Sequence, residues 1–446
     1  MNLPNKSSLG AVIKQFVGSY IFKGSSVLFF MKILGALLAY VLQWYIIYVS
    51  DEKQYGIYAY IINTTFLFAT FGLLGFESSI NRFFPVYLKN NETSSIKGFM
   101  VVSYLLPFVL NSLIALTFYL VVINSTILTE YHHILYFLLF MMPLLGFVKL
   151  NAKYFTASRN VFWGIFPNEV IRYLAFMITL FILTQVRGKG LEALQLLTIS
   201  VGVYLLVVTT QFSLLFKKFK SFLLTKGFSF ETKTWVTTSA QLLLVTGFSV
   251  MLKKIDLQIV GLYHEPEVVG QYNIVMRITD LCLFISMSVL AVINPMISSN
   301  MDKPNKIRSI MTRATLLVFL PTLGLAIFLI IFHPFILGIF GEKYVEGSTP
   351  LIILLIGQVL TTFFGPLGPL LSMTGYQKFT ARYLFIVTMI NVILNFIFIP
   401  KYGIVAAAVT TVISLMLFRI LLYYKVNKVF GFKLFILEVF QNRKSK

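Results

Sequence analysis

Long apolar segments set the limits on how this chain can fold. Most of the twelve reach the roughly twenty residues that a helix needs to cross the hydrocarbon core of a membrane. Hydrophobic residues make up 58% of the chain and charged residues only 12%, too little to cover a soluble domain. A membrane β-barrel would instead show shorter, alternating segments. The sequence therefore predicts an all-α polytopic membrane protein with helices at about 24–49, 56–80, 98–122, 133–152, 162–185, 191–216, 236–262, 268–296, 314–332, 350–372, 380–399 and 403–424.

Two of these segments carry signals of an irregular helix. Pro143 interrupts the short apolar run at 133–152. The segment at 350–372 contains Gly365 followed directly by Pro366. A kink in a spanning helix frees backbone groups that lipid cannot satisfy, so protein or a cavity must cover it. We therefore expect the segment at 350–372 to be broken near Gly365.

The net charge of the 446-residue chain is +21, and the placement of its basic residues decides what this means. Such residues collect in every second connection, which is the bias that places loops in the cytoplasm. Nucleic-acid binding is not needed to explain the charge, and both termini are predicted to be cytoplasmic. The basic connections lie around 6–23, 82–97, 149–159, 217–233, 303–313, 378–382 and after 419. The opposite connections hold only Lys53, Arg187, Lys189, Lys343 and Lys401.

Cysteine and histidine form no recognisable site. Cys282 is the only cysteine, which excludes an intramolecular disulfide and a cysteine-rich metal centre. His132 and His133 are adjacent, and adjacent histidines on a helix are poor chelators. We expect neither a metal nor a cofactor. The N-terminal stretch lacks a short apolar core followed by a small-residue cleavage site, so we expect no removable signal peptide.

The basic stretch at 217–233 divides the chain, with six apolar segments on each side. An even number means that both halves enter the membrane in the same sense, as in transporters built from parallel repeats about an axis along the membrane normal. A weak repeat agrees with this, because Gly56 and Tyr58 recur with the same spacing as Gly270 and Tyr272. We predict an N-terminal bundle at 1–220, a linker at 221–233, a C-terminal bundle at 234–426 and a basic tail at 427–446.

Eight charged residues inside predicted helices are the candidates for function, since a charge in a lipid-spanning segment is costly. Six of them form basic–acidic pairs spaced i,i+3, which puts both partners on one helix face. Such pairs either neutralise each other structurally or line a cleft that responds to protons or substrate. The pairs are Lys253 with Asp256, Arg277 with Asp280 and Arg172 with Glu169.

Lys32 and Lys254 lie outside these pairs. Lys32 has no acidic residue within a turn or two, and it either faces a cavity or extends to the membrane interface. Lys254 lies about 100° around the helix from Lys253, so the two cannot face the same way. If Lys253 pairs with Asp256, Lys254 is the freer cation.

Several stretches, taken in order, resemble a known family. Their order and spacing resemble those of the polysaccharide-export flippases, the O-antigen and exopolysaccharide translocases of the multidrug/oligosaccharidyl-lipid/polysaccharide exporter superfamily. No single motif is diagnostic, but the resemblance covers nearly the whole chain. The stretches are DEKQYGIY at 51–58, GLLGFESSINRFFP at 72–85, Asp256 with the Gly270-Gln271-Tyr272 turn and the helix ending at Pro295, FGEKY at 340–344 and NVILNFIFIPKYGIVAAA at 391–408.

The resemblance implies a V-shaped fold of two bundles. It also implies that the chain moves an isoprenoid-diphosphate-linked oligosaccharide from the cytoplasmic to the outer leaflet of a bacterial cytoplasmic membrane. A polysaccharide polymerase and a chain-length regulator would be its partners, H⁺ or Na⁺ could couple transport, and no catalytic residue is implied. Because Arg and Lys bind phosphate, we expect a cationic cavity. The candidates for substrate binding are Lys32, Arg277, Lys254, Lys253 and Arg172, and those for coupling or structural ion pairs are Asp256, Asp280 and Glu169.

Two other functions stay open. A multidrug antiporter of the same superfamily would favour acidic residues in its cavity, whereas cations outnumber acids among these candidates. A membrane polymerase or glycosyltransferase would need a sizeable outer loop with catalytic residues. The longest outer connection, at about 333–349, offers only Glu342 and Glu346. Both observations favour the flippase.

Overall fold

The computed structural model describes residues 20–223 and 227–432, and the regular elements in these ranges are helices. The predicted basic N-terminal segment, part of the linker and most of the tail lie outside the described residues. The helices of the first half are α2 (Tyr20–Val49), α3 (Glu52–Gly72), α4 (Phe76–Asn90), α5 (Thr93–Ile123), the 3₁₀ turn η1 (Thr129–Ile134), α6 (Phe137–Ala157), α7 (Val161–Phe166), the π-helical turn η2 (Pro167–Ile171), α8 (Arg172–Arg187) and α9 (Ala193–Leu223).

The second half contains the same number of membrane-spanning units. Its helices are α10 (Thr232–Tyr263), α11 (Pro266–Ser298), α12 (Pro304–Ile331), α13 (His333–Gly338), the 3₁₀ turn η3 (Glu342–Gly347), α14 (Ser348–Phe363), α15 (Leu367–Met373) and α16 (Gln377–Phe430).

The predicted number of spans is confirmed for the described residues. Ten helices are long and apolar enough to cross a membrane, and α3 with α4, bent by 48°, adds an eleventh span. The last of the ten, α16, is two helices that meet at Gly403, where φ is 57° and ψ −142°. Only a residue without a side chain adopts this conformation readily. Counting α16 as two spans accounts for all twelve predicted segments.

The predicted break near Gly365 is also confirmed. Helix α14 ends at Phe363, Gly365 has a φ of +75°, and the span resumes as α15 at Leu367. A Cβ on Gly365 would lie 2.2 Å from the Thr315 hydroxyl, so protein covers the freed backbone there. Pro143 behaves differently, because it lies near the start of an unbroken α6 that runs on to Ala157.

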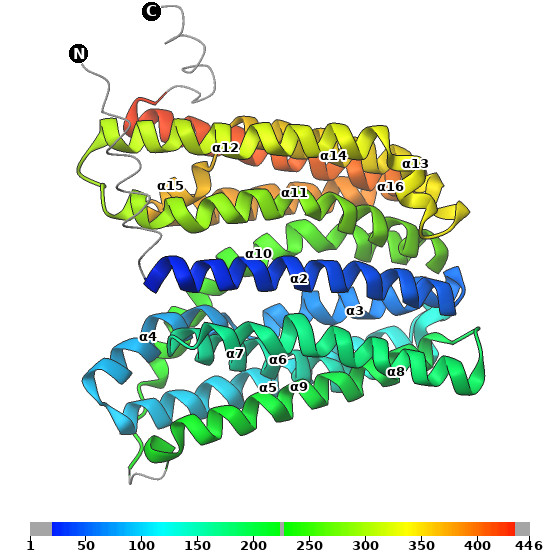
Figure 1. Ribbon diagram of the computed structural model, residues 1–446, viewed down its shortest axis with the longest axis horizontal. Coiled ribbons are helices and arrows are strands. Elements are labelled where there is room, and N and C mark those ends of the chain that lie inside the picture. Colours follow the sequence, from blue (N-terminus) through cyan, green and yellow to red (C-terminus); the bar gives the residue numbers. More distant parts are fainter. Residues whose placement is uncertain (1–19, 224–226, 433–446) are drawn as a thin grey trace, which may run out of the picture.

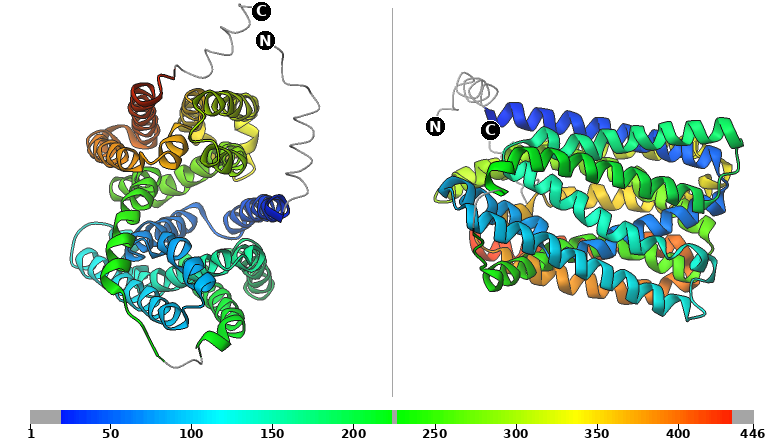
Figure 2. Two further views of the ribbon diagram at one scale, coloured as in Figure 1. Left: turned by 90° about the vertical axis from the view of Figure 1, so that its left-hand side faces the viewer. Right: turned by 90° about the horizontal axis from the view of Figure 1, so that it is seen from below.

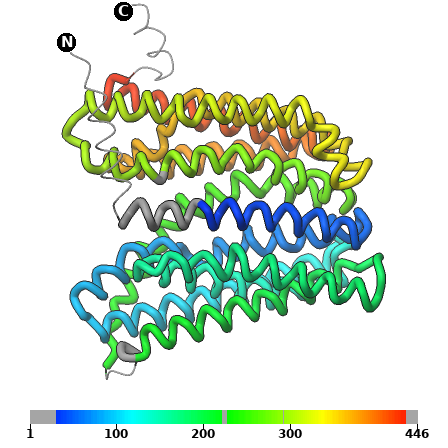
Figure 3. Tube along the Cα trace, in the orientation of Figure 1, coloured from blue at the N-terminus to red at the C-terminus, as the bar shows by residue number. Residues whose placement is uncertain are grey.

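The helices form two lobes, α2–α9 and α10–α16 (Figure 1), and α2 lies at the border between them in both Figure 1 and Figure 2. The connections after α4, α6, α9, α11 and α15 lie at one end of the molecule, which we call the basic end. The connections after α2, α5, α8, α10 and α13 lie at the opposite end, as the Cα trace in Figure 3 shows. Gly403 lies there too, because a Cβ on it would be 3.7 Å from the ring of His264, the residue after α10.

The hydrophobic core differs between the two ends. At the opposite end one cluster includes residues from both lobes, for example Ile57 of α3, Val260 of α10 and Tyr272 of α11. At the basic end the cores are separate. One is built on Phe76 and its neighbours in the first lobe and includes Trp235 of α10, and the other is built on Ile297 and its neighbours in the second lobe. The lobes therefore share one core at the opposite end. At the basic end they have separate cores, and the start of α10 joins them, since Trp235 donates to the Tyr87 hydroxyl at 2.9 Å and Ser239 to the Ser79 hydroxyl at 2.7 Å.

Candidate functional site

At the opposite end the two lobes close against each other where the start of α3 meets the start of α11. We call this contact the seal. A Cβ on Gly56 would lie 1.7 Å from the Pro266 carbonyl oxygen, so only glycine allows this approach. A Cβ on Gly270 would lie 3.0 Å from the Tyr55 ring. Gly56 and Gly270 are the two glycines of the weak repeat, and the fold packs them against each other across the lobe boundary.

Buried polar side chains continue the seal toward the middle of the membrane. Asn63 donates to Asn273 at 3.0 Å, and Asn273 donates to the Tyr55 hydroxyl at 2.8 Å. Thr64 donates to Gln258 at 2.8 Å. Each of these hydrogen bonds joins one lobe to the other. Since an unpaired polar group in this environment is costly, the bonds favour the sealed arrangement.

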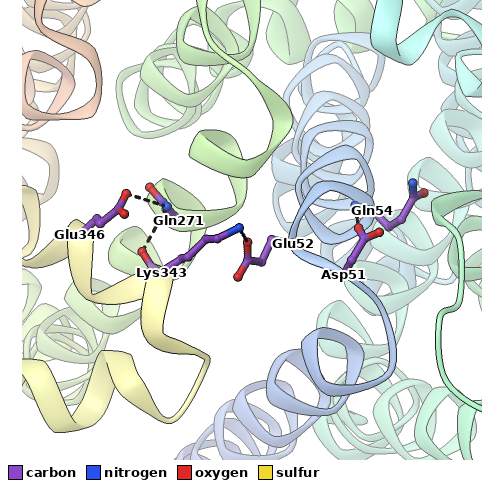
Figure 4. A network of polar contacts seen from close by, with 6 residues as sticks. All are labelled: Asp51, Glu52, Gln54, Gln271, Lys343 and Glu346. Carbon is purple, nitrogen blue, oxygen red and sulfur yellow. Dashed lines mark hydrogen bonds and ion pairs between the residues drawn. The ribbon is translucent and has the colours of Figure 1, made fainter.

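An ion pair closes the outermost layer of the seal (Figure 4). Lys343 of η3 lies 2.6 Å from the Glu52 carboxylate of α3, and both groups are partly exposed. Gln271 of α11 donates to the Lys343 carbonyl at 3.1 Å and to Glu346 at 3.3 Å. The FGEKY stretch at 340–344 thus contacts both lobes.

On the basic side of the seal a cavity of about 240 Å³ lies between α2, η2 and α8 of one lobe and α11 of the other. We call it the central cavity. It brings together two predicted cations, Lys32 and Arg277, and two predicted acids, Glu169 and Asp280. Lys32 is exposed and lines the wall, and the Arg277 Nε is buried without a hydrogen-bond partner among the described residues. The Tyr40 hydroxyl donates to the Arg277 carbonyl and so marks the inner limit of the cavity.

The π-helical turn η2 places Glu169 on this wall. Pro167 begins η2 and removes one backbone donor, which favours the wider turn. Gly35 of α2 leaves room for the carboxyl group, because a Cβ there would lie 2.6 Å from a Glu169 carboxylate oxygen. Two local irregularities, neither of which periodicity predicts, therefore position one acidic side chain.

Arg172 lies inside the first lobe. Its guanidinium donates to the Asn168 carbonyl at 3.0 Å and to the Tyr204 hydroxyl at 3.2 Å, and it stacks 4.2 Å from the centre of the Tyr173 ring. A small cavity of about 40 Å³ is lined by both Arg172 and Arg277. Arg172 therefore holds α8 against α9. It lines the small cavity that it shares with Arg277, and it does not line the central cavity.

The three predicted i,i+3 ion pairs are not formed within the described residues. Asp256 is 1% exposed and accepts hydrogen bonds from the Tyr272 hydroxyl at 2.7 Å, the Thr411 hydroxyl at 3.1 Å and the Leu257 amide at 2.8 Å. Donors on α11 and α16 therefore replace Lys253 as its partners. Lys254 instead lies within electrostatic range of Asp280 and of Arg277.

A second cavity, of about 220 Å³, lies inside the second lobe between α10, α11, α14 and α16. We call it the C-lobe hollow. Asp256, Tyr272 and Thr411 form its polar end, and Lys253 and Arg419 line it as cations. Asp280 lines both the hollow and the central cavity, so the two spaces adjoin on either side of α11.

The sequence predicts that Lys149 and Arg419 belong to basic loops, and this was wrong, because each lies within a helix, one in each lobe. Lys149 lies within α6, where its amine donates to Thr70 at 2.9 Å and contacts the Phe66 ring at 4.1 Å. Arg419 lies within α16 and lines the C-lobe hollow. The predicted basic loops included both residues because each lies near the end of its predicted apolar segment, at 133–152 and 403–424. A signal was available, because each is followed by further helix-forming apolar residues.

The sequence model of a family described as "Polysaccharide biosynthesis protein" matches residues 21–301, and that of the MatE family matches 242–397. The chain is 30% identical over 162 residues to the "Probable low-salt glycan biosynthesis flippase Agl15" of Haloferax volcanii, a match that spans 36% of this chain and 34% of that protein. It is 23% identical over 426 residues to an uncharacterized membrane protein, MJ1068, of Methanocaldococcus jannaschii, spanning 89% and 82% of the two chains.

Solved structures of the same fold include the lipid II flippase MurJ in an inward closed conformation. Its TM-score is 0.69 at 19% identity, covering 91% of this chain and 87% of that one. A multidrug resistance MATE family transporter gives 0.65 in its outward-facing conformation and 0.64 in its inward-facing conformation, both at 14% identity. The first covers 94% of this chain and 97% of the other, and the second 96% and 98%. At these identities the likeness concerns the fold, and it confirms the predicted two-lobe helical architecture.

Proposed function

Because the chain belongs to the polysaccharide biosynthesis protein family, whose model matches more than half of it, we propose that it is a flippase for lipid-linked oligosaccharides. The cargo is an oligosaccharide on an isoprenoid diphosphate, carried from the cytoplasmic to the outer leaflet for the assembly of a surface polysaccharide such as O-antigen, capsule or exopolysaccharide. The observation that carries this proposal is the central cavity on the basic side of the seal. Its wall includes Lys32 from the first lobe and Arg277 from the second.

The charge of the cargo explains why these two side chains matter. A diphosphate cannot enter hydrocarbon without cations and a polar path. Arg277 offers an Nε–H that has no partner in the described residues, and Lys32 adds a mobile point charge. Glu169 and Asp280 balance these cations while the cavity is empty of cargo, and they are the groups through which H⁺ or Na⁺ would act, together with Asp256.

The seal supports alternating access as the mechanism. With the basic end in the cytoplasm, the cavity opens inward and the seal faces outward. Both termini then lie in the cytoplasm, and the chain resides in the cytoplasmic membrane. The sequence favoured a bacterial membrane, whereas the two relatives named above are archaeal. A polysaccharide polymerase and a chain-length regulator remain the expected partners.

Reconstitution tests this proposal. The purified chain is placed in vesicles that contain a fluorescent polyprenyl diphosphate carrying a disaccharide, and loss of fluorescence to a membrane-impermeant quencher reports movement between leaflets. We expect wild-type protein to accelerate movement and the Lys32→Gln, Arg277→Gln double variant to lose about tenfold or more of that rate, since charge-assisted contacts to phosphate are strong. Lys401→Gln, at the opposite end, serves as the control. No acceleration by the wild-type chain would contradict the proposal.

A multidrug antiporter is the second candidate, and one observation favours it. The MatE model matches residues 242–397, and the cavity holds acidic as well as basic side chains. An antiporter of this kind would export a cationic dye from energised vesicles, and neutralising Glu169 or Asp280 would stop it. A flippase for an anionic lipid would leave the dye where it is. The membrane-enzyme alternative is less supported, since Glu346 of the outer connection is bonded to Gln271 in the seal.

A further inference from the structure

Within the part of the chain that the structure describes, the C-lobe hollow contains a cation without a partner. Arg419 lies about halfway along the second part of α16 and is half-buried. Among the described residues, no hydrogen bond, ion pair or aromatic contact joins its guanidinium to another group. A guanidinium in a membrane-embedded lobe normally has an acid or several acceptors around it, because leaving it unpaired is costly. Arg419 therefore lacks the counter-charge that its position calls for.

The acids nearest to this hollow are already engaged. Asp256 accepts three hydrogen bonds, from Tyr272, Thr411 and the Leu257 amide. Asp280 lies at the border with the central cavity, in electrostatic range of Lys254. Lys253 adds a second cation to the same wall. The hollow thus offers two positive groups to an incoming anion.

Neutral polar groups line the rest of the hollow. The hydroxyls of Ser249, Thr279 and Thr361 each donate to a carbonyl of their own helix, which leaves their oxygens as acceptors. The Gln358 side chain, also on the wall, can both donate and accept. The walls between these groups are aliphatic, with Phe418 beside Arg419. Dispersed hydroxyl and amide groups on an apolar wall suit the alternating polar and apolar faces of a sugar ring.

The hollow adjoins the place where the diphosphate would bind. On α11, Arg277 and Phe284 face the central cavity, while Met276 and Thr279 face the hollow, and Asp280 lies between the two sets. In a lipid-linked oligosaccharide the first sugars are attached directly to the diphosphate. A diphosphate held at Lys32 and Arg277 therefore places the glycan within reach of the hollow.

We propose that the C-lobe hollow is the glycan subsite, and that Arg419 with Lys253 selects glycans that carry an acidic group, either a carboxylate or a phosphate ester. The proposal rests on the flippase function above and adds to it a class of glycan and the residues that recognise it. Arg419 is a binding residue in this account, and the diphosphate remains with Lys32 and Arg277.

Two synthetic lipids that differ in one group test the proposal. Both are polyprenyl diphosphates linked to a disaccharide, and the terminal sugar is glucuronic acid in one and glucose in the other. Binding to the purified full chain in lipid nanodiscs gives a dissociation constant for each. We expect wild-type protein to bind the acidic lipid about tenfold more tightly, the gain of one charge-assisted contact. Arg419→Gln should abolish this preference, because it should weaken binding of the acidic lipid far more than binding of the neutral one.

Three further variants make the result decisive. Arg419→Lys keeps the charge and should retain part of the preference, which separates recognition from a folding defect. Arg382→Gln changes an exposed arginine in the first part of α16, before Gly403, and should change nothing. Arg277→Gln should weaken both lipids equally. An Arg419→Gln variant that weakens both lipids equally would assign Arg419 to the diphosphate and overturn the glycan assignment, as would equal binding of both lipids by wild-type protein. If Arg277→Gln leaves both affinities unchanged, the flippase proposal itself fails.

Discussion

Helix α11 meets the first lobe in two places along its length, and the two are packed in opposite ways. At the opposite end α3 and α11 touch through backbone, with Gly56 on the Pro266 carbonyl, and Asn63 and Asn273 hydrogen bond across the boundary. Toward the basic end α11 faces α2 and η2 across a cavity, and no described residue is a hydrogen-bond partner of the Arg277 Nε. Shape and hydrogen bonds are matched where α11 meets α3, whereas at the cavity one buried guanidinium nitrogen is left without a partner among the described residues. In the function proposed above, the first place is the closure and the second is the binding site.

The largest effect is expected at Gly56. Gly56→Val places a side chain where the Pro266 carbonyl lies, so the lobes must separate at the seal. We expect a destabilisation of about 3 kcal/mol, at the upper end of the range for overpacking, and new access of water-soluble reagents to the seal. Thermal unfolding measures the first, and labelling of a cysteine placed at Val269, a buried apolar residue of α11 next to Gly270, measures the second.

Gly202→Val is the matched control for this prediction. Gly202 also lies in a membrane helix, α9, but a Cβ there would meet nothing within 4 Å. Its stability and labelling should equal those of wild type. If the two valine variants behave alike, the backbone contact at Gly56 does not hold the lobes together.

The next effect concerns the polar pair in the seal. Asn273→Leu leaves the Asn63 amide without its partner in a buried place and should cost about 1–3 kcal/mol. The Asn63→Leu, Asn273→Leu double variant should cost less than the sum of the single changes, because both unpaired groups are then gone. Additive costs would show that the two side chains do not interact. Chemical or thermal unfolding of the four proteins gives the coupling.

These two predictions also show what the sequence could and could not reveal. The sequence alone predicts the repeat that contains Gly56 and Gly270 and the break near Gly365, because glycine and proline signals are local. It could not show that the repeated glycines pack on each other, since that depends on how two distant segments meet. The partners of Asp256 were missed for the same reason. The rule for i,i+3 spacing selects Lys253, whereas Tyr272 and Thr411 come from other helices.

A smaller effect is expected from Lys149, on the cavity side of the comparison. Tyr58 and Ile62 of α3 line the small cavity with Arg277, and Phe66 and Thr70 follow on the same helix face toward the basic end. Phe66 is 37% exposed although α3 packs against helices of both lobes, so that face borders the open part of the boundary. We therefore predict that Lys149 lies on the path of an anion from the basic end to Arg277.

Lys149→Met keeps the length of the side chain and removes its charge. We expect a rise of about threefold in the lipid concentration that half-saturates transport, with little change in maximal rate, because a charge on the entry path acts mainly on association. The rise should shrink at high ionic strength. Lys217→Met, an exposed lysine near the basic end of α9, is the control. A fall in maximal rate without a change in half-saturation would place Lys149 outside the entry path.

The smallest effect is expected at the outermost layer of the seal, where Lys343 pairs with Glu52 (Figure 4). Two thirds of the Lys343 side chain is exposed to solvent, at 66%, so water and salt screen the attraction. Lys343→Ala should keep the melting temperature within about 2 °C of wild type. Its effect should appear instead in how often the seal opens, measured as faster labelling of a cysteine at Val269 in low salt and not in high salt. A large loss of stability would mean that the ion pair, and not the glycine contact beneath it, closes this end of the molecule.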